Sequence, residues 1–188
     1  MGEKYHDLAP TGNGEPVLVI PGFGCGDVTT TLFRKYLSTQ GFEPYGWDNN
    51  INLGPNQKTI DHIDQRLDEI YHEHNGHKVA LVGHSLGGVY ARVWGNKTPE
   101  QVSRIITLGS PLNHSGDTVA LPILKQLFHI LNPDIDIDEF AQMCMVSEDI
   151  PTTSIYTHYD GIIHWRTSID DEIPEGAKVD YVEVSNIE

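Results

Sequence analysis

Cysteine and positive charge are both scarce in this 188-residue sequence. Its two cysteines, Cys25 and Cys144, are too few for a disulfide framework and lack the spacing of metal ligands. Only 12 lysines and arginines oppose 27 aspartates and glutamates, so the formal net charge is −15. This charge repels phosphate backbones and anionic lipid headgroups, which argues against nucleic acid as a partner and favours a small neutral or lipid-like substrate.

Long apolar runs and a leader-like start are missing as well. No run approaches the roughly 18 apolar residues of a membrane span, so stable membrane insertion is not expected. The start of the chain lacks the basic and apolar regions of a secretory signal, which favours the cytoplasm but leaves the location open. The length suits one domain over residues 1–188, and the sequence leaves the oligomeric state unknown.

Short apolar runs alternate with segments in which apolar residues recur at helical spacing. Buried strands are predicted from VLVI (17–20), FEPYGW (42–47), KVALVGH (78–84), RIITLGSP (104–111), SIYTHYD (154–160) and VDYVEVS (179–185). Helices are predicted around 32–37, 60–70 and 86–93. This alternation predicts an α/β fold with a mostly parallel sheet, right-handed crossovers and helices on both faces.

A helical insertion is predicted where the alternation stops, over residues 113–149. Its first part carries apolar residues at helical spacing, namely Leu121, Leu124, Leu127, Phe128 and Leu131. The insertion is expected over the carboxyl ends of the strands, where open α/β sheets bind their ligands. It could form a lid over an apolar acyl pocket, or its leucines could belong to the ordinary core.

The segment Gly83-His84-Ser85-Leu86-Gly87 fits the G-x-S-x-G pattern of a nucleophile elbow, a sharp strand-to-helix turn that presents a serine. The pattern lies between an apolar strand and an apolar-striped helix, as an elbow requires. A plain turn in which Ser85 caps the helix is the alternative. As a nucleophile, the Ser85 hydroxyl needs a base, usually a histidine that a carboxylate orients.

A glycine-rich turn, Pro21-Gly22-Phe23-Gly24, follows the first predicted strand. In an elbow-bearing fold, one N–H from this loop and the N–H after the nucleophile hold the oxyanion, which assigns the backbone N–H groups of Phe23 and Leu86. The alternative is a dinucleotide-binding loop, but Asp27 stands where the third glycine of G-x-G-x-x-G would be, facing a pyrophosphate. No cofactor is therefore expected.

Five segments spread over residues 16–185 carry a family likeness: VLVIPGFGCGD, YGWDNNINLGPN, LVGHSLGGVYAR, ITLGSP and SIYTHYDGIIHWR. Together they resemble the bacterial α/β-hydrolase family, in particular its small lipase- and esterase-like members. The elbow and YDGIIHW are the most specific of them. The resemblance implies the α/β-hydrolase fold and hydrolysis of carboxylic esters by a serine nucleophile, without metal or organic cofactor.

The same resemblance makes Asp160 the acid of a catalytic triad, at the end of the penultimate strand. An aspartate before a glycine also begins many turns, and that is the alternative for Asp160 before Gly161. The chain order favours the acid, because in this fold the serine comes first, the acid second and the histidine last.

The histidine of such a triad is not found. In the resembled family it lies just after the last strand, whereas no histidine follows His164 in this sequence. The chain could stop before the catalytic loop and closing helix, or His164 or His158 could substitute as the base. The third alternative is a catalytically inactive hydrolase-like domain that binds an apolar ligand or a protein partner.

The remaining histidines have ordinary interpretations. His84 beside the nucleophile is interpreted as a filler of the elbow rather than as its base. His72, His74 and His77 are interpreted as solvated surface, because their spacing does not place three imidazoles on one helix face. No metal site is expected.

Overall fold

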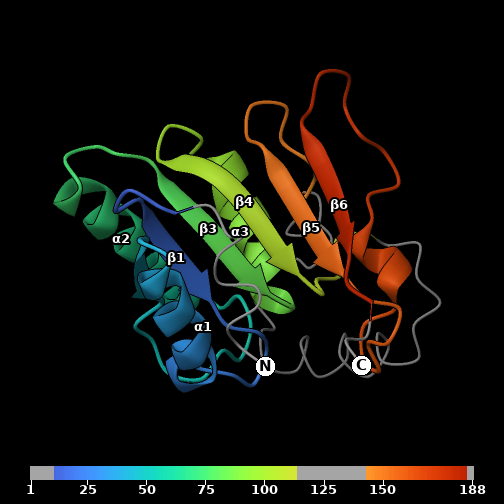
Figure 1. Ribbon diagram of the computed structural model, residues 1–188, viewed down its shortest axis with the longest axis horizontal. Coiled ribbons are helices and arrows are strands. Elements are labelled where there is room, and N and C mark those ends of the chain that lie inside the picture. Colours follow the sequence, from blue (N-terminus) through green and yellow to red (C-terminus); the bar gives the residue numbers. More distant parts are fainter. Residues whose placement is uncertain (1–10, 114–142, 186–188) are drawn as a thin grey trace.

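One parallel sheet organises the residues that the computed structural model describes, 11–113 and 143–185. Within these ranges six strands lie in the order β2-β1-β3-β4-β5-β6, and every neighbouring pair is parallel (Figure 1). The strands are β1 (Pro16–Ile20), β2 (Glu43–Gly46), β3 (Val79–His84), β4 (Val102–Leu108), β5 (Thr152–Tyr156) and β6 (Val179–Glu183). The prediction of an α/β fold with a parallel sheet is confirmed.

Helices connect the first four strands, as their apolar spacing predicts. They are α1 (Asp27–Thr39), α2 (Gln57–Glu73) and α3 (Leu86–Lys97), and a short 3-10 helix, η2 (Trp165–Ser168), follows β5. Asn56 caps α2, because its side-chain oxygen accepts the Thr59 N–H at 3.0 Å. Gly41 follows the end of α1 with a φ of 85°, the left-handed conformation that ends many helices.

The strand side chains alternate between two apolar layers. On β1, Leu18 and Ile20 face the larger core, which α2 and α3 complete. Val17 points the other way, into a smaller core against which Phe33 of α1 packs. Figure 1 accordingly shows α1 in front of the sheet and α3 behind it. Full burial of one such side chain contributes about 1.5–3 kcal/mol, so packing on both faces holds the sheet in place.

The apolar residues of α1 divide between the sheet and the surface. Their spacing predicts the helix correctly, but Leu32 is 82% exposed and Tyr36 is 43% exposed. Phe33 and Leu37 are the residues that pack on the sheet. Spacing therefore identifies the helix, whereas apolar residues at neighbouring positions leave its rotation undetermined.

The last predicted strand segments differ in length from those observed. β5 ends at Tyr156 rather than at residue 160, because the chain turns at His158 and Tyr159 and leaves the sheet. Of the predicted insertion, only residues 113 and 143–149 are described, and none of these is helical; the predicted leucine-rich helix lies outside the described residues. No helix in 11–113 or 143–185 is long and apolar enough to cross a membrane.

The chain changes direction across the sheet between β1 and β3. From β1 it moves outward to β2 at the edge and then returns to β3 on the other side of β1. The place where the strand order reverses, between β1 and β3, is a topological switch point, because the loops after these two strands leave it in opposite directions. Open α/β sheets bind their ligands at such points. The glycine-rich turn and Ser85 follow these two strands directly.

Candidate active site

Ser85 has a strained backbone between β3 and α3. Its φ is 52° and its ψ is −121°, a combination that residues with a side chain rarely adopt. The Ser85 N–H donates to the Leu108 carbonyl at 2.9 Å, and the Ser85 carbonyl accepts the Gly88 N–H at 2.9 Å. These bonds fix the turn at the carboxyl end of the sheet, where Ser85 is half-buried.

Glycines around Ser85 permit the turn because their positions have no room for a side chain. A Cβ atom on Gly83 would lie 2.1 Å from the Gly87 carbonyl oxygen. One on Gly87 would lie 2.2 Å from the Ile20 carbonyl oxygen, and one on Gly88 would lie 2.0 Å from Ser110 Oγ. Gly83 and Gly87 of the G-x-S-x-G pattern, together with Gly88, thus allow α3 to pack closely on β1, β3 and the end of β4.

The glycine-rich turn after β1 lies directly against Ser85. A Cβ atom on Gly22 would lie 3.1 Å from the Ser85 Cβ atom. The Cys25 N–H donates to the Gly22 carbonyl at 3.1 Å and closes a β-turn in which Gly24 has a φ of 72°. Within the described residues, the Phe23 N–H donates to no acceptor.

Leu86, the residue after Ser85, carries a second N–H group in addition to that of Phe23. It is the first residue of α3, where helix N–H groups lack an acceptor within the helix and the helix dipole is positive. The N–H groups of Phe23 and Leu86 therefore belong to the two segments that touch at Gly22 and Ser85. Two such preorganised donors are what an oxyanion requires.

Asp27, which stands at the third position of the glycine pattern, has a structural role. Its two carboxylate oxygens accept the Trp47 N–H at 3.1 Å and the Asp48 N–H at 2.9 Å. Asp27 is also the first residue of α1, so its negative charge occupies the helix start that would have to receive a pyrophosphate. The loop chemistry is therefore unsuited to a dinucleotide.

Asp160 lies in the loop after β5, and its carboxylate approaches the end of β4. Its Oδ1 atom accepts the N–H groups of Ile162 and Ile163, both at 2.9 Å. Its Oδ2 atom lies 3.1 Å from the point at which a Cβ atom on Gly109 would stand. Gly109 directly follows β4, the neighbour of the strand that ends in Ser85. Within the described residues, Oδ2 accepts no hydrogen bond, so it is available to orient a base.

The two histidines that could substitute as the base are engaged elsewhere. The His158 ring stacks on the Trp165 ring, with 4.3 Å between centroids, and its Nε2 atom lies 3.7 Å from Glu183 Oε1. His164 is exposed, and its Nδ1 atom accepts the Arg166 N–H at 3.4 Å at the start of η2. In the described part of the chain, neither histidine bonds to Asp160.

The other described histidines do not complete the site either. His84 is exposed beside Ser85, and its Nδ1 atom lies 3.1 Å from the point at which a Cβ atom on Gly22 would stand. The interpretation of His74 as solvated is wrong, because its side chain is 15% exposed and its Nε2 atom lies 2.9 Å from the Tyr45 hydroxyl. Among the described residues, no three His, Cys, Asp or Glu side chains are arranged to hold a metal.

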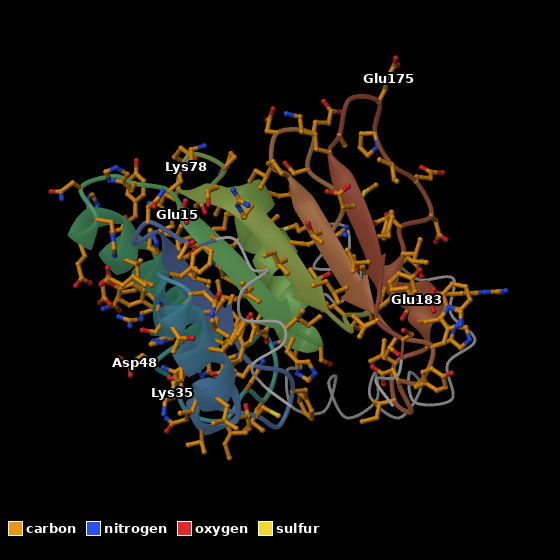
Figure 2. All side chains as sticks on the ribbon, in the orientation of Figure 1. Glu15, Lys35, Asp48, Lys78, Glu175 and Glu183 are labelled. Atoms are coloured by element: carbon orange, nitrogen blue, oxygen red, sulfur yellow. The ribbon has the colours of Figure 1, made fainter. Side chains whose placement is uncertain are left out.

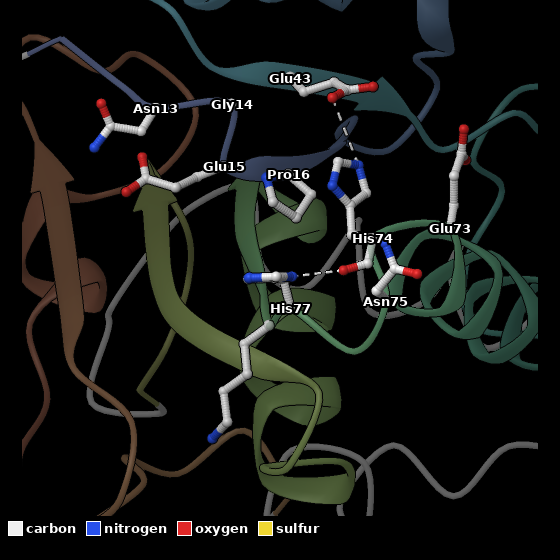
Figure 3. Close-up of a pocket in the computed structure, with 10 residues that line it drawn as sticks. Asn13, Gly14, Glu15, Pro16, Glu43, Glu73, His74, Asn75 and His77 are labelled. Carbon is white, nitrogen blue, oxygen red and sulfur yellow. Dashed lines mark hydrogen bonds and ion pairs between the residues drawn. The ribbon is translucent and has the colours of Figure 1, made fainter.

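A cavity of about 550 Å³ lies at the opposite end of the sheet, where β1, β2 and β3 begin (Figure 3). Glu15, Glu43, His74 and Lys78 are among its lining residues. Figure 2 shows Glu15 and Lys78 at this end, whereas Asp48 and Glu183 lie where strands stop. The cavity is therefore separate from Ser85.

The contacts of two glycines at the site were not predicted from the sequence. Gly22 and Gly109 both lie within the segments that carry the family resemblance, but only the structure shows what each one touches. Gly22 lies against Ser85, and Gly109 has a φ of 52° and faces the Asp160 carboxylate. Both contacts join loops that follow different strands, so no local pattern could have indicated them.

A family model matches most of the chain. Residues 17–158 match the model of the alpha/beta hydrolase fold. The chain therefore belongs to the α/β-hydrolase fold family, which confirms the resemblance found in the sequence. No curated protein matches the sequence.

Solved structures show the same fold at low sequence identity. A structure of the metagenome-derived lipolytic enzymes LipS and LipT matches with a TM-score of 0.67 and 15% identity, covering 94% of this chain and 86% of that one. A monoacylglycerol lipase of Paleococcus ferrophilus matches with a TM-score of 0.62 and 15% identity over 93% and 86% of the two chains. A 2-hydroxy-6-oxo-6-phenylhexa-2,4-dienoate hydrolase of Rhodococcus matches with a TM-score of 0.57 and 11% identity over 92% and 84%.

Proposed function

We propose that this protein hydrolyses carboxylic esters through an acyl-serine intermediate. Ser85 is the nucleophile, Asp160 is the acid that orients the base, and the N–H groups of Phe23 and Leu86 hold the oxyanion. The observation that carries the proposal is the strained Ser85 backbone with the Gly22 turn packed against it. Strain of this kind persists where the surrounding structure requires it, and a capping serine would not need it.

The reaction follows from the positions of these groups. Attack of Ser85 Oγ on the ester carbonyl forms a tetrahedral intermediate, whose oxyanion accepts the N–H groups of Phe23 and Leu86. The proton of Ser85 passes to a base, which returns it to the leaving alcohol; water then resolves the acyl-serine by the same route. Asp160 Oδ2, which accepts no hydrogen bond from a described residue, would fix the tautomer of that base and stabilise its charged form.

The proposal requires a histidine as the base, within reach of both Asp160 Oδ2 and Ser85 Oγ. His164 and His158 are close to Asp160 in the sequence. In the structure, however, the His158 ring stacks on Trp165, and His164 Nδ1 accepts the Arg166 N–H at the start of η2. Either ring would have to leave its present partner to reach Ser85. The two are therefore weaker assignments than Ser85 and Asp160.

A neutral or lipid-like ester fits the charge and the surroundings of Ser85. A net charge of −15 disfavours polyanionic substrates. Exposed apolar side chains lie near the glycine-rich turn and in the Asp160 loop. Ile51 adjoins Asn52, which bonds to the turn, and Ile162 follows Asp160. Two of the structural neighbours named above are lipolytic enzymes, which supports an ester, although the dienoate hydrolase shows that this fold also serves other substrates.

The proposal is tested by labelling the purified chain with a serine-directed fluorophosphonate and mapping the label by mass spectrometry. We expect the label on Ser85, and hydrolysis of p-nitrophenyl butyrate that is lost in Ser85→Ala. Ser38→Ala, which changes an exposed serine on α1, is the matched control and should keep both properties.

The competing function is that of an inactive hydrolase-like domain which binds an apolar ligand or a protein partner. The observation in its favour is that no described histidine bonds to Ser85 or Asp160. An unlabelled Ser85, together with equal ester turnover in the chain and in Ser85→Ala, would establish this alternative and exclude the enzyme.

A further inference from the structure

Asn52 is a buried polar residue between two exposed apolar ones. Ile51 is 59% exposed and Leu53 is 48% exposed, whereas Asn52 is 0% exposed. This reverses the usual distribution, in which the apolar side chain is buried and the amide is solvated. Burial of an amide costs free energy unless hydrogen bonds replace those to water, so the partners of Asn52 indicate its role.

Asn52 holds the glycine-rich turn on both sides of Phe23. Before Phe23, the Asn52 Nδ2 atom donates to the Pro21 carbonyl at 2.9 Å. After it, the Asn52 carbonyl accepts the Gly24 N–H and the Asn52 N–H donates to the Cys25 carbonyl, both at 2.8 Å. Three bonds from one residue thus fix the turn, while the Phe23 N–H stays free of any described acceptor.

The same side chain is anchored to α3. Asn52 Oδ1 accepts the Tyr90 hydroxyl at 3.2 Å and the Gly54 N–H at 3.2 Å. Tyr90 is fully buried, and burial raises the pKa of Tyr90 well above its ordinary value, so the hydroxyl stays protonated and donates. Tyr90 lies one helical turn after Leu86. One buried amide therefore joins the segments that carry the two oxyanion donors.

We propose that Asn52 is a positioning residue of the oxyanion site, which keeps the Phe23 N–H aligned with the Leu86 N–H. The inference rests on the proposed function, because it needs an oxyanion at Ser85. Asn52 does not touch the substrate; it acts on the turn. Oxyanion donors work because they are oriented before the reaction, so a turn that can rotate loses transition-state stabilisation while ground-state binding is retained.

The test compares Asn52→Asp, Tyr90→Phe and the unaltered chain. Asn52→Asp keeps the Oδ1 atom that accepts from Tyr90 and Gly54 but replaces the Nδ2 donor to the Pro21 carbonyl with a second oxygen. Tyr90→Phe keeps the ring and removes the anchor of Asn52. Ser154→Ala is the control, because Ser154 is buried and bonded to the Ser168 carbonyl at 2.6 Å, two strands away from Ser85.

We expect kcat for p-nitrophenyl butyrate and the rate of Ser85 phosphonylation to fall about 10- to 100-fold in Asn52→Asp, with KM unchanged. Tyr90→Phe should show a smaller loss in the same direction. Ser154→Ala should lower the midpoint of thermal unfolding without lowering kcat.

Three outcomes would overturn the inference in different ways. If Asn52→Asp folds and reacts at the rate of the unaltered chain, Asn52 does not position the site, and the proposed function still stands. If Asn52→Asp does not fold, an unchanged kcat in Tyr90→Phe would show instead that Asn52 does not position the site. If Ser85 of the unaltered chain reacts with no fluorophosphonate, the proposed function and the inference fail together.

Discussion

Arg92 and Asp170 form a buried bidentate ion pair between α3 and the segment that follows Asp160. Arg92 Nη1 and Nη2 lie 2.6 and 2.8 Å from the two Asp170 oxygens, and the side chains are 1% and 7% exposed. The Tyr181 hydroxyl donates to Asp170 Oδ2 at 2.7 Å and accepts the Asp170 N–H. The pair therefore joins the helix that starts after Ser85 to the segment that follows Asp160.

Removal of one partner from this pair should strongly destabilise the fold. Asp170→Asn leaves the Arg92 charge buried without compensation, and we expect a loss of about 3–5 kcal/mol in the free energy of unfolding. The double variant Arg92→Met/Asp170→Leu should lose less than the sum of the single changes, because no charge remains buried. Urea denaturation measures both.

The control is the exposed pair of Lys97 and Asp64, whose side chains are 45% and 38% exposed. Lys97→Met should cost less than about 1 kcal/mol, since solvent screens such pairs. A loss in Asp170→Asn no larger than that in Lys97→Met would contradict the structural role of the buried pair.

Asp160→Asn should abolish turnover and leave the fold intact. Its amide oxygen can still accept the N–H groups of Ile162 and Ile163, so the loop is preserved. Oδ2 becomes an amide nitrogen that cannot orient a histidine in the required tautomer, and we expect kcat to fall about 10⁴-fold. Ester kinetics and the thermal midpoint, measured on the same sample, separate the two effects.

The matched control for Asp160 is Asp180→Asn, which removes an exposed carboxylate from β6. It should leave kcat unchanged. Equal activity of Asp160→Asn and the unaltered chain would show that Asp160 only begins a turn.

The two thiols should differ in reactivity. Burial raises the pKa of Cys144 from 9.0 to about 12, whereas Cys25 is half-buried in the glycine-rich turn. Iodoacetamide at pH 8 should modify Cys25 in the folded chain and Cys144 only after unfolding in urea, as mapped by mass spectrometry. Cys25→Ser should remove the reaction of the folded chain. Rapid native modification of Cys144 would show that this thiol is accessible.

The raised pKa of Cys144 also makes the free energy of unfolding depend on pH. Because the folded chain favours the neutral thiol, stability is unaffected by this group below pH 9.0 and decreases as the pH rises toward about 12. Cys144→Ala should reduce the loss of stability across that alkaline window.

The order of strands and helices could be predicted because it depends on local patterns. VLVI and KVALVGH are apolar runs, and the 60–70 segment repeats apolar residues every three or four positions. The elbow was also predictable, since its glycines lie within a few residues of Ser85. Asn52 was not, because its partner Tyr90 lies 38 residues away and neither residue signals the other. The contact of Asp160 with Gly109 could not be predicted for the same reason, because it forms only when the strands assemble into the sheet.

The rotation of α1 provides a direct test of what spacing leaves undetermined. Leu32 and Phe33 are adjacent apolar residues, yet Leu32 is 82% exposed and Phe33 packs on the smaller core. Leu32→Ala should change the free energy of unfolding by no more than about 0.5 kcal/mol, whereas Phe33→Ala should lose about 3 kcal/mol. Equal losses in urea denaturation would mean that α1 is rotated.

Gly83→Ala should strongly destabilise the chain. The added Cβ would lie 2.1 Å from the Gly87 carbonyl oxygen, a backbone atom that cannot move without separating α3 from β3. We expect a loss of about 3 kcal/mol or more, at the upper end of overpacking effects. Gly161→Ala is the control, since no atom lies within 4 Å of its Cβ position, and it should be neutral or slightly stabilising. If Gly83→Ala is as stable as Gly161→Ala in urea denaturation, β3 and α3 are not packed closely, and Ser85 is not held in a tight turn.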